Sequence, residues 1–434
     1  MGALNMLSAV TAAQQLAAGK ITAEALVRDC LERINQREGD VQAWEIVDGE
    51  AALAQARAAD AGPRRGLLHG LPVGVKDLID TADLPTTYGS PIYAGHRPAW
   101  DAPCVALTRA AGGIIIGKTV TTEFAVMQPN KTRNPHNTAH TPGGSSSGSA
   151  AAVADYMVPL AFGTQTAGSI IRPAAYCGVV GYKPSFGLVS RVGVKALSDT
   201  LDTVGTIART VPDAALFAAA LTGRAELMVN KPWSGSLRVG ICQTYEWKHA
   251  APETVAALES AARQLASAGA GVITVNLPPT YASLVQAQTD IMFAEQAQSL
   301  AHERLAHWPH ISARLQGILA EGLKVTHERY DAAQMLARNC RRTLTEVFVD
   351  CDVLLAPSAM GTAPAGLGMT GDPVFNRMWT LLRTPCVNLP VAVAANGLPV
   401  GLQVVGAFGC DAQTLAAAHW VHQTLVHDAL PRVG

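Results

Sequence analysis

The chain has 434 residues, 49% of them apolar and only 15% charged, which is typical of a globular protein with a large core and excludes an intrinsically disordered one. Its formal net charge of −1 provides no electrostatic attraction for a nucleic acid or an anionic membrane surface, so we expect neither as a partner. The length allows one large domain or two smaller ones.

Cysteine spacing and the N-terminal segment indicate a reducing setting. None of the eight cysteines forms a C-x-x-C pair, so we expect neither a structural zinc site nor a disulfide framework. The segment "MGALNMLSAVTAAQQ" has no basic start and no uninterrupted apolar run, and no run approaches the roughly 18 apolar residues of a spanning helix. We therefore expect a cytoplasmic protein without a signal peptide, a membrane span or a bound metal.

The first sixty residues read as helices. "SAVTAAQQLAAG" ends near Gly19, a typical residue just past a helix, and "TAEALVRDCLERI" begins with Thr22 ahead of an acidic first turn. From Leu71 the pattern changes. Short apolar runs such as "LPVGVKD" and "GGIIIGKT" alternate with helical stretches such as "APCVALTRAA", which indicates an α/β sheet.

The second half continues this alternation. After Pro232, "LRVGIC", "PETVAALESAARQLASAGA" and "GVITVNLP" predict a β-α-β unit. Residues 282–349 show helical spacing with few turn signals. The end returns to strands in "DVLLAPS", "CVNLPVAV" and "LPVGLQVVG", followed by a last helix from Asp411. Because strands both precede and follow the helical stretch, we predict one continuous sheet with inserted helices.

The stretch "GGIIIGKT", residues 112–119, matches the nucleotide-binding pattern G-x-x-x-x-G-K-[ST] letter for letter. That pattern binds phosphate only when a strand precedes the glycine loop and a helix follows it. Here a helical stretch precedes, and three consecutive isoleucines favour a strand over a loop of exposed amides. We therefore predict a strand and no nucleotide site.

The stretch "TPGGSSSGSA", residues 141–150, allows three interpretations. A nucleophile elbow would place Ser146 in G-x-S-x-G after a strand, but the preceding "NKTRNPHNTAHTP" is polar and turn-rich. The later histidines that could serve such a serine lie in helical stretches: His302, His307, His419 and His422. A linker would be polar on both sides, whereas this stretch runs into the apolar "AAAVADYMVPLAFGTQTAGSIIRPAAYCGVVGYKP".

The third interpretation is a serine activated by a lysine. Lysine can accept a proton when burial lowers its pKa, and Lys76 stands among small and apolar residues in "GLPVGVKDLID". Taken alone, Lys76 is better explained as an ordinary residue at the end of an amphipathic strand. A second element, "GTQTAGSIIRPAA", places Ser169 in a tight turn whose small residues leave amides free for a developing negative charge. Pro173 suits the first turn of a following helix.

Three elements in this order resemble the amidase signature family: "GVKD" at residues 74–77, "GGSSSGSA" at 143–150 and "GTQTAGS" at 163–169. Ser145 and Ser169 are 24 residues apart, which is the spacing of the family. The resemblance extends over essentially the whole chain and includes "CGVVGYKPSFG" and "GLPVGLQVVG".

The resemblance implies a fold and an assembly. The fold would be one α/β domain with a central twisted mixed β-sheet flanked by helices, over residues 66–434. Residues 1–65 would form an N-terminal helical arm, and in the family such an arm often takes part in dimer contacts. We therefore expect a homodimer, and no cofactor.

The resemblance also implies roles for single residues. Ser169 would be the nucleophile that forms an acyl-enzyme, Ser145 the bridging serine, and Lys76 the base that begins and ends the proton relay. The peptide bond before the bridging serine is cis in the family, here between Gly144 and Ser145, and Gly144 counts among the substrate-binding backbone.

The oxyanion hole of the family consists of backbone amides just before the nucleophile. The corresponding residues here are Thr166, Ala167, Gly168 and Ser169. The chain departs from the family at Gln165, where members commonly have Asp, and at Ala167, where they have Gly. Because only backbone amides are needed, a methyl group at Ala167 would alter the shape of the hole and leave the chemistry in place.

Arg172 follows Ser169 by three residues. The variant "GTQTAGSIIRPA" resembles the malonamidase branch of the family, in which an arginine at this position holds the substrate carboxylate. A guanidinium pairs with a carboxylate in a planar, bidentate manner that suits this role. The alternative is that Arg172 pairs with a carboxylate of the protein itself.

Three hypotheses follow. The first is a stand-alone amidohydrolase that releases ammonia from a small-molecule amide, including amides that bear a carboxylate. The second is a protein resembling the glutaminase-type A subunit of glutamyl-tRNA amidotransferase, which hydrolyses glutamine and passes ammonia to a partner. The third is a catalytically inactive binding protein, against which the presence of Lys76, Ser145 and Ser169 argues.

Overall fold

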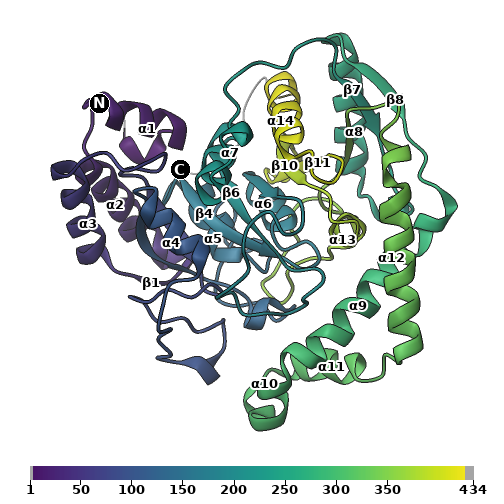
Figure 1. The fold of residues 1–434 in the computed structure, drawn as a ribbon, viewed down its shortest axis with the longest axis horizontal. Coiled ribbons are helices and arrows are strands. Elements are labelled where there is room, and N and C mark those ends of the chain that lie inside the picture. Colours follow the sequence, from purple (N-terminus) through teal and green to yellow (C-terminus); the bar gives the residue numbers. More distant parts are fainter. Residues whose placement is uncertain (1–2, 426–434) are drawn as a thin grey trace.

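An eleven-stranded mixed sheet forms the centre of residues 3–425, the part of the chain that the computed structural model describes (Figure 1). The strand order is β1-β3-β2-β4-β6-β5-β10-β11-β9-β7-β8. The strands are β1 (Trp44–Val47), β2 (Pro72–Lys76), β3 (Ile114–Thr119), β4 (Leu160–Gln165), β5 (Val180–Lys183), β6 (Thr203–Ala208), β7 (Arg238–Ile241), β8 (Gly271–Thr274), β9 (Val353–Pro357), β10 (Cys386–Val393) and β11 (Pro399–Val405). The continuous sheet predicted from the sequence is confirmed.

Helices flank this sheet. The α-helices are α1 (Ala9–Ala17), α2 (Ala23–Val41), α3 (Gly49–Ala61), α4 (Pro103–Ala110), α5 (Ser147–Ala154), α6 (Ile171–Cys177), α7 (Val211–Thr222), α8 (Pro252–Ser267), α9 (Leu284–Ser299), α10 (Ala301–Ala306), α11 (Ala313–Gly322), α12 (His327–Val347), α13 (Val374–Leu381) and α14 (Asp411–Leu425). Short 3-10 helices span Leu4–Met6, Pro91–Tyr93, Glu123–Ala125, Ala225–Leu227, Trp247–His249, Pro279–Ser283 and Trp308–His310. None of the helices in residues 3–425 is long and apolar enough to cross a membrane.

Parallel pairing occurs at two places in the sheet: β2 lies between β3 and β4, and β7 lies between β8 and β9. The unit β7-α8-β8 is the predicted β-α-β unit. Since β2 and β4 run parallel, their carboxyl ends meet at the same edge of the sheet. This places Lys76, the last residue of β2, and Gln165, the last residue of β4, on the same side.

The central strands are buried on both faces. Every residue of β2, β3, β4 and β6 is buried, so these strands lack the polar alternation of a half-exposed strand. The core around them is mostly aliphatic and rich in alanine. Three lysines nevertheless lie fully buried in this region: Lys76, Lys118 and Lys183. A buried lysine either finds hydrogen-bond partners or loses its proton, and these three differ in how they do so.

The N-terminal arm was expected to be purely helical, but it also contains a β-strand. Residues Trp44 to Val47 form β1, which pairs antiparallel with β3 at one edge of the sheet. The expected helices are present as α1, α2 and α3, and α2 starts at its predicted cap, because the Thr22 side chain accepts a hydrogen bond from the Ala25 N–H. Because β1 hydrogen-bonds to β3, the N-terminal arm contributes an edge strand to the main sheet.

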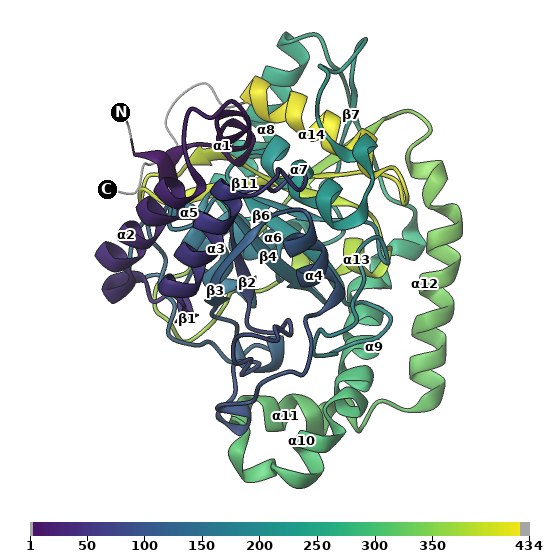
Figure 2. The same ribbon diagram turned by 60° about the vertical axis from the view of Figure 1, so that its left-hand side comes forward.

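The predicted helical stretch is confirmed as α9 to α12, which we call the helical insert, residues 284–347. It projects along one side of the sheet, with α10 and α11 at its far end (Figures 1 and 2). Helix α9 packs against α11, α12 and α13. Because α13 lies near the carboxyl ends of the central strands, the insert forms one wall beside them.

Strand β3 takes up six of the eight residues of the nucleotide-binding pattern, which confirms the interpretation of this stretch as a strand. Its backbone lies between β1 and β2, so its amides belong to sheet ladders. The lysine of the pattern, Lys118, lies 3.1 Å from the Asp77 carboxylate and donates to Thr86. We expect that ATP with magnesium leaves the melting temperature unchanged in a thermal shift assay. A saturable, magnesium-dependent rise would contradict the assignment.

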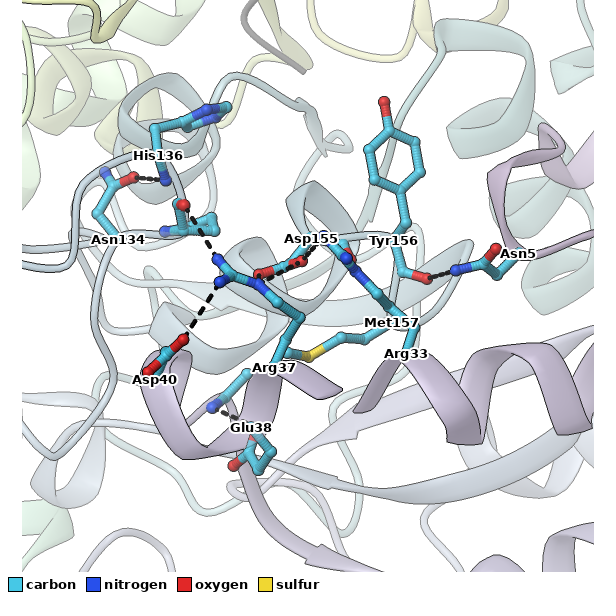
Figure 3. Close-up of polar contacts among 12 residues, drawn as sticks. Asn5, Arg33, Arg37, Glu38, Asp40, Asn134, His136, Asp155, Tyr156 and Met157 are labelled. Atoms are coloured by element: carbon cyan, nitrogen blue, oxygen red, sulfur yellow. Dashed lines mark hydrogen bonds and ion pairs between the residues drawn. The ribbon is translucent and has the colours of Figure 1, made fainter. Parts of the chain in front are cut away.

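A buried polar cluster ties the N-terminal arm to the segments on either side of residues 141–146 (Figure 3). Asp155, just after α5, is fully buried and accepts hydrogen bonds from Arg33 and Arg37 of α2. Arg37 also reaches the Pro135 carbonyl oxygen at 3.5 Å. The same arginine thus contacts the loop that precedes the glycine-serine turn and the helix that follows it.

Replacing Asp155 by alanine should lower the free energy of unfolding by about 3 kcal/mol, because two partly buried guanidinium groups would lose their carboxylate. Chemical denaturation measures this loss. The matched control is Asp40→Ala, which removes an exposed carboxylate 3.3 Å from the same Arg37 and should cost less than about 0.5 kcal/mol. Equal losses of unfolding free energy in the two variants would show that the buried ion pairs of Asp155 stabilise the protein no more than the exposed one of Asp40.

Candidate active site

Lys76 ends β2, and its side-chain nitrogen is surrounded by hydroxyl groups. Its Nζ lies 2.7 Å from the Ser145 Oγ, 3.1 Å from the Ser146 Oγ and 2.7 Å from the Thr164 Oγ1. The side chain is 0% exposed. No carboxylate among the described residues contacts it, which distinguishes Lys76 from Lys118. The contact with Ser145 was predicted, and the one with Thr164 was not.

The environment of Lys76 favours its neutral form. Burial lowers the pKa of Lys76 well below its ordinary value, and the more distant charge of Asp202 opposes this only in part. The adjacent Asp77 contacts Lys118 and Thr87 instead, as the strand geometry predicted. A neutral lysine with a serine hydroxyl at 2.7 Å is suited to accept that proton.

The glycine-serine stretch forms a packed turn that leads into α5. The Gly144–Ser145 peptide bond is cis, as the family resemblance implied. Gly143 adopts φ +80°, and a Cβ there would lie 2.9 Å from Pro173 and Tyr176. Ser145 is 2% exposed and lines a small pocket. The tight approach around Gly143 excludes the linker interpretation.

Ser169 lies in the loop between β4 and α6, and a side-chain amide fixes this loop. The Gln165 Oε1 accepts hydrogen bonds from the N–H groups of Ile170 and Ile171 at 2.9 and 3.1 Å, while its Nε2 donates to Thr380 at 3.0 Å. An aspartate would supply only acceptors here. Gln165 therefore adds a bond to α13 that a carboxylate could not make.

Backbone amides before Ser169 are free to stabilise an anion. In residues 3–425, no hydrogen-bond partner takes the N–H of Ala167, Gly168 or Ser169. Gly168 leaves no room for a side chain, since a Cβ would lie 2.4 Å from the Asn376 Oδ1. The arrangement offers donors of the kind that an oxyanion hole requires, at three of the four residues predicted for it.

One pocket collects most of the predicted residues. It has about 40 Å³ of free space and is lined by Ser145, Thr166, Ala167, Ser169 and Arg172, together with apolar side chains of the helical insert. Ser169 is 8% exposed there. Larger hollows lie elsewhere, such as one of about 550 Å³ beside α1 and α7, but that one contains none of these five residues. The small pocket is therefore the candidate active site.

Arg172 lies in this pocket without a carboxylate partner. Its Nη1 donates to the Gly371 carbonyl oxygen at 2.8 Å, and its Nη2 donates to the Gly144 carbonyl oxygen at 2.6 Å and to Thr370 at 3.2 Å. No ion pair with a carboxylate of the described residues is formed. Burial lowers the pKa of Arg172 to about 10, so the guanidinium stays cationic at neutral pH.

Sequence reasoning missed several residues that shape the pocket. Asp202 accepts hydrogen bonds from Thr166 at 2.5 Å and from two backbone amides, which fixes the start of the loop before Ser169. Arg377 of α13 also lines the pocket. These side chains reach the pocket only because segments distant in the sequence fold together, so no local sequence pattern pointed to them. In residues 3–425, no group of His, Cys, Asp or Glu side chains is placed to hold a metal ion.

Comparison with known proteins gives consistent matches over most of the chain. The model of the Amidase family matches residues 25–415. The A subunit of the glutamyl-tRNA(Gln) amidotransferase of Chloroflexus aggregans is 36% identical over 464 residues, covering 94% of each chain. A crystal structure described as an amidase superposes with a TM-score of 0.88 at 31% identity, covering 96% of this chain and 100% of that one. The peptide amidase of Stenotrophomonas maltophilia superposes with a TM-score of 0.81 at 27% identity over 97% of each chain.

Proposed function

The chain belongs to the amidase family, and from this premise we propose that it releases ammonia from a small carboxamide through an acyl-enzyme on Ser169. Ser169 attacks the amide carbonyl carbon while its proton passes through Ser145 to Lys76. The free backbone amides of Ala167, Gly168 and Ser169 stabilise the negatively charged oxygen of the tetrahedral intermediate. Expulsion of ammonia takes the proton back along the same path.

Hydrolysis of the acyl-enzyme repeats these steps with water. Lys76 again accepts a proton through Ser145, hydroxide adds to the ester carbon, and collapse frees the acid and Ser169. The observation that supports this relay most directly is the 2.7 Å contact between the Lys76 Nζ and the Ser145 Oγ, in a site where burial lowers the pKa of the lysine. The packed turns on both sides hold the two serines at one pocket.

The names of the related sequences favour an enzyme that works in a complex with a partner protein. The sequence analysis put a stand-alone amidohydrolase first, but relatives at 32–36% identity are named as the A subunit of glutamyl-tRNA(Gln) amidotransferase, which fits the second hypothesis better. We therefore propose first that this chain supplies ammonia within a complex. The aligned region of 464 residues exceeds this chain of 434, so that relative has segments which this chain lacks.

A stand-alone amidase is the second candidate, and the pocket favours it. Two arginines line the pocket and no acidic side chain does, which suits a small anionic amide. Solved structures described as amidases also cover 96% and 97% of the chain. The homodimer implied by the family resemblance belongs with this candidate.

Purification of the chain alone separates the two candidates. Ammonia release from glutamine and from a panel of small amides is measured with and without candidate partner proteins, and light scattering gives the assembly. A partnered enzyme should show weak glutaminase activity alone and a marked rise in the complex. Full turnover of an amide by the chain alone would reject the partnered candidate. No ammonia above a Ser169→Ala control from any amide, with or without partners, would reject the proposed reaction itself.

A further inference from the structure

The three free N–H groups before the nucleophile, those of Ala167, Gly168 and Ser169, belong to peptide units whose carbonyl oxygens are all hydrogen-bonded. The peptide bonds of residues 166–169 are trans. In a trans peptide the carbonyl group and the N–H group of the next residue point in opposite directions. A donor that holds one carbonyl oxygen therefore turns the following N–H group to the opposite side of the loop.

The carbonyl group that precedes the Ala167 N–H is held by the helical insert. Gln288 of α9 is fully buried, and its Nε2 donates to the Thr166 carbonyl oxygen at 3.0 Å. The Gln288 Oε1 accepts from the Arg377 Nη1 at 2.7 Å. Burial lowers the pKa of Arg377 and the charge of the exposed Asp372 opposes this, so the guanidinium keeps its proton. Because a guanidinium has only donors, it takes the oxygen end of Gln288 and leaves the N–H end for Thr166.

The carbonyl group that precedes the Gly168 N–H is held by α13. Thr380 is 1% exposed, and its hydroxyl donates to the Ala167 carbonyl oxygen at 2.8 Å. A hydroxyl has a single proton, so its second partner must be a donor. That partner is the Gln165 Nε2 at 3.0 Å, since the Gln165 Oε1 already accepts from two backbone N–H groups. Gln165 thus leaves the proton of Thr380 for Ala167.

The third carbonyl group needs no side chain. The Gly168 carbonyl oxygen accepts from the Arg172 N–H at 2.9 Å, in the first turn of α6. The backbone of the helix alone therefore orients the Ser169 N–H. The other two donors lie far away in the sequence, since Gln288 is 122 residues from Thr166 and Thr380 is 213 residues from Ala167. The orientation of two of the three free N–H groups therefore depends on tertiary contacts.

We propose that Gln288 and Thr380 are positioning residues of the oxyanion hole, which turn the N–H groups of Ala167 and Gly168 toward the reacting carbonyl oxygen. The inference rests on the proposed acyl-enzyme reaction. Neither side chain is among the residues that line the pocket, so neither binds the substrate directly. Both act by fixing, before the reaction, donors that stabilise charge only in the tetrahedral state. Their loss should weaken binding of that state and leave binding of the planar amide almost unchanged.

Gln288→Glu tests the first contact, because it keeps the shape of the side chain and reverses one of its ends. A carboxylate accepts from Arg377 but cannot donate to the Thr166 carbonyl oxygen, which it repels. We expect kcat for the best amide of the wild-type enzyme to fall by about 10- to 100-fold, somewhat less than the loss of a whole oxyanion donor. KM should stay within about threefold. Since the carboxylate pairs with Arg377, the melting temperature should change little.

Thr380→Val tests the second contact at nearly constant volume and should lower kcat by a similar factor, again with little change in KM. Thr380→Ser keeps the hydroxyl and should restore most of the activity. The matched control is Thr384→Val, because the fully buried Thr384 donates to the Trp379 carbonyl oxygen at 3.1 Å, outside the loop. It should keep the wild-type kcat. Equal losses of activity in Thr380→Val and Thr384→Val would contradict the proposal.

A boronic acid measures the tetrahedral state directly. The Ser169 oxygen adds to the boron of a small alkylboronic acid, the proton passes to Lys76, and boron becomes a tetrahedral anion that resembles the intermediate. Its inhibition constant should rise in Gln288→Glu and in Thr380→Val by the factor by which kcat/KM falls. An unchanged inhibition constant or an unchanged kcat in both variants would overturn the proposal. Ammonia release by the wild-type enzyme no faster than by Ser169→Ala would instead reject the proposed reaction, together with the inference that rests on it.

Discussion

Ser169→Ala should abolish ammonia release and leave the fold intact. Loss of the nucleophile removes the acyl-enzyme route, and comparable serine hydrolases lose on the order of 10⁴- to 10⁶-fold in kcat. The hydroxyl makes no hydrogen bond that holds the fold in the described residues, and the loop around it is fixed by Gln165 instead. Steady-state kinetics with the best amide, together with a thermal melt, measures both parts of this expectation.

The matched control for Ser169→Ala is Ser147→Ala. Ser147 is another buried hydroxyl of the same region, and its Oγ contacts the Val120 carbonyl oxygen. Its removal should lower stability slightly and keep kcat within a few-fold. If the two variants lost activity equally, the loss would reflect a disturbed site and not a missing nucleophile.

Covalent labelling identifies the nucleophile directly. A fluorophosphonate should modify Ser169, which is exposed to the pocket, and not Ser146, which is fully buried and hydrogen-bonded to Thr164 and Lys76. Peptide mapping by mass spectrometry gives the modified residue. Labelling of Ser146 would restore the nucleophile-elbow interpretation that its surroundings argue against.

Lys76→Ala and Lys76→Arg should both lose nearly all activity, by about 10²- to 10⁴-fold in kcat, because general-base catalysis contributes in that range. The proton relay requires neutral Lys76. Burial lowers the pKa of Lys76 well below its ordinary value, so activity should rise with pH through an apparent pKa far below that of a free lysine, and should reach a plateau above it. The apparent value belongs to the coupled unit of Lys76, Ser145 and Ser169.

Arginine is the informative replacement. Guanidinium keeps its proton at any workable pH, so Lys76→Arg preserves the charge of protonated lysine and removes the base. The activity of Lys76→Arg should therefore not show the rise with pH that is expected for the wild-type enzyme. Thr86→Val is a control at another buried lysine, since it removes a hydroxyl partner of Lys118 and should leave the rise of activity with pH in place. An active Lys76→Arg enzyme with an unchanged rise would show that the base is another residue.

The sequence predicted the elements of the site because each is a local pattern. "GVKD" ends a buried strand, and the glycines of the two serine elements are required by contacts that a Cβ would violate, as at Gly143 and Gly168. The family resemblance then supplied the relation between Lys76, Ser145 and Ser169, which lie far apart in the chain. The strand predicted within residues 112–119 followed from three isoleucines, and β3 at Ile114–Thr119 confirms it.

Tertiary contacts account for what the sequence did not predict. The four residues of β1 are too short to show an alternating pattern, and they form a strand because β3 offers its free edge. Arg377 and Gln288 come from α13 and α9, two helices that give no sign in the sequence of facing Ser169. A cation in an amphipathic helix normally indicates a solvated face, and only the packing of the insert against α13 turns Arg377 toward the pocket.

The strand order has a consequence for synthesis of the protein. The hairpin β10-β11 lies between β5 and β9, so it is the only part of the described sheet that joins β1–β6 to β7–β9. A ribosome finishes residues 3–385 before this hairpin appears. Until then the nascent chain holds two separate half-sheets, and the open edge of β5 can pair with other chains. Translation stalled before residue 386 should therefore yield an aggregation-prone product that depends on chaperones, although it already contains Lys76, Ser145 and Ser169.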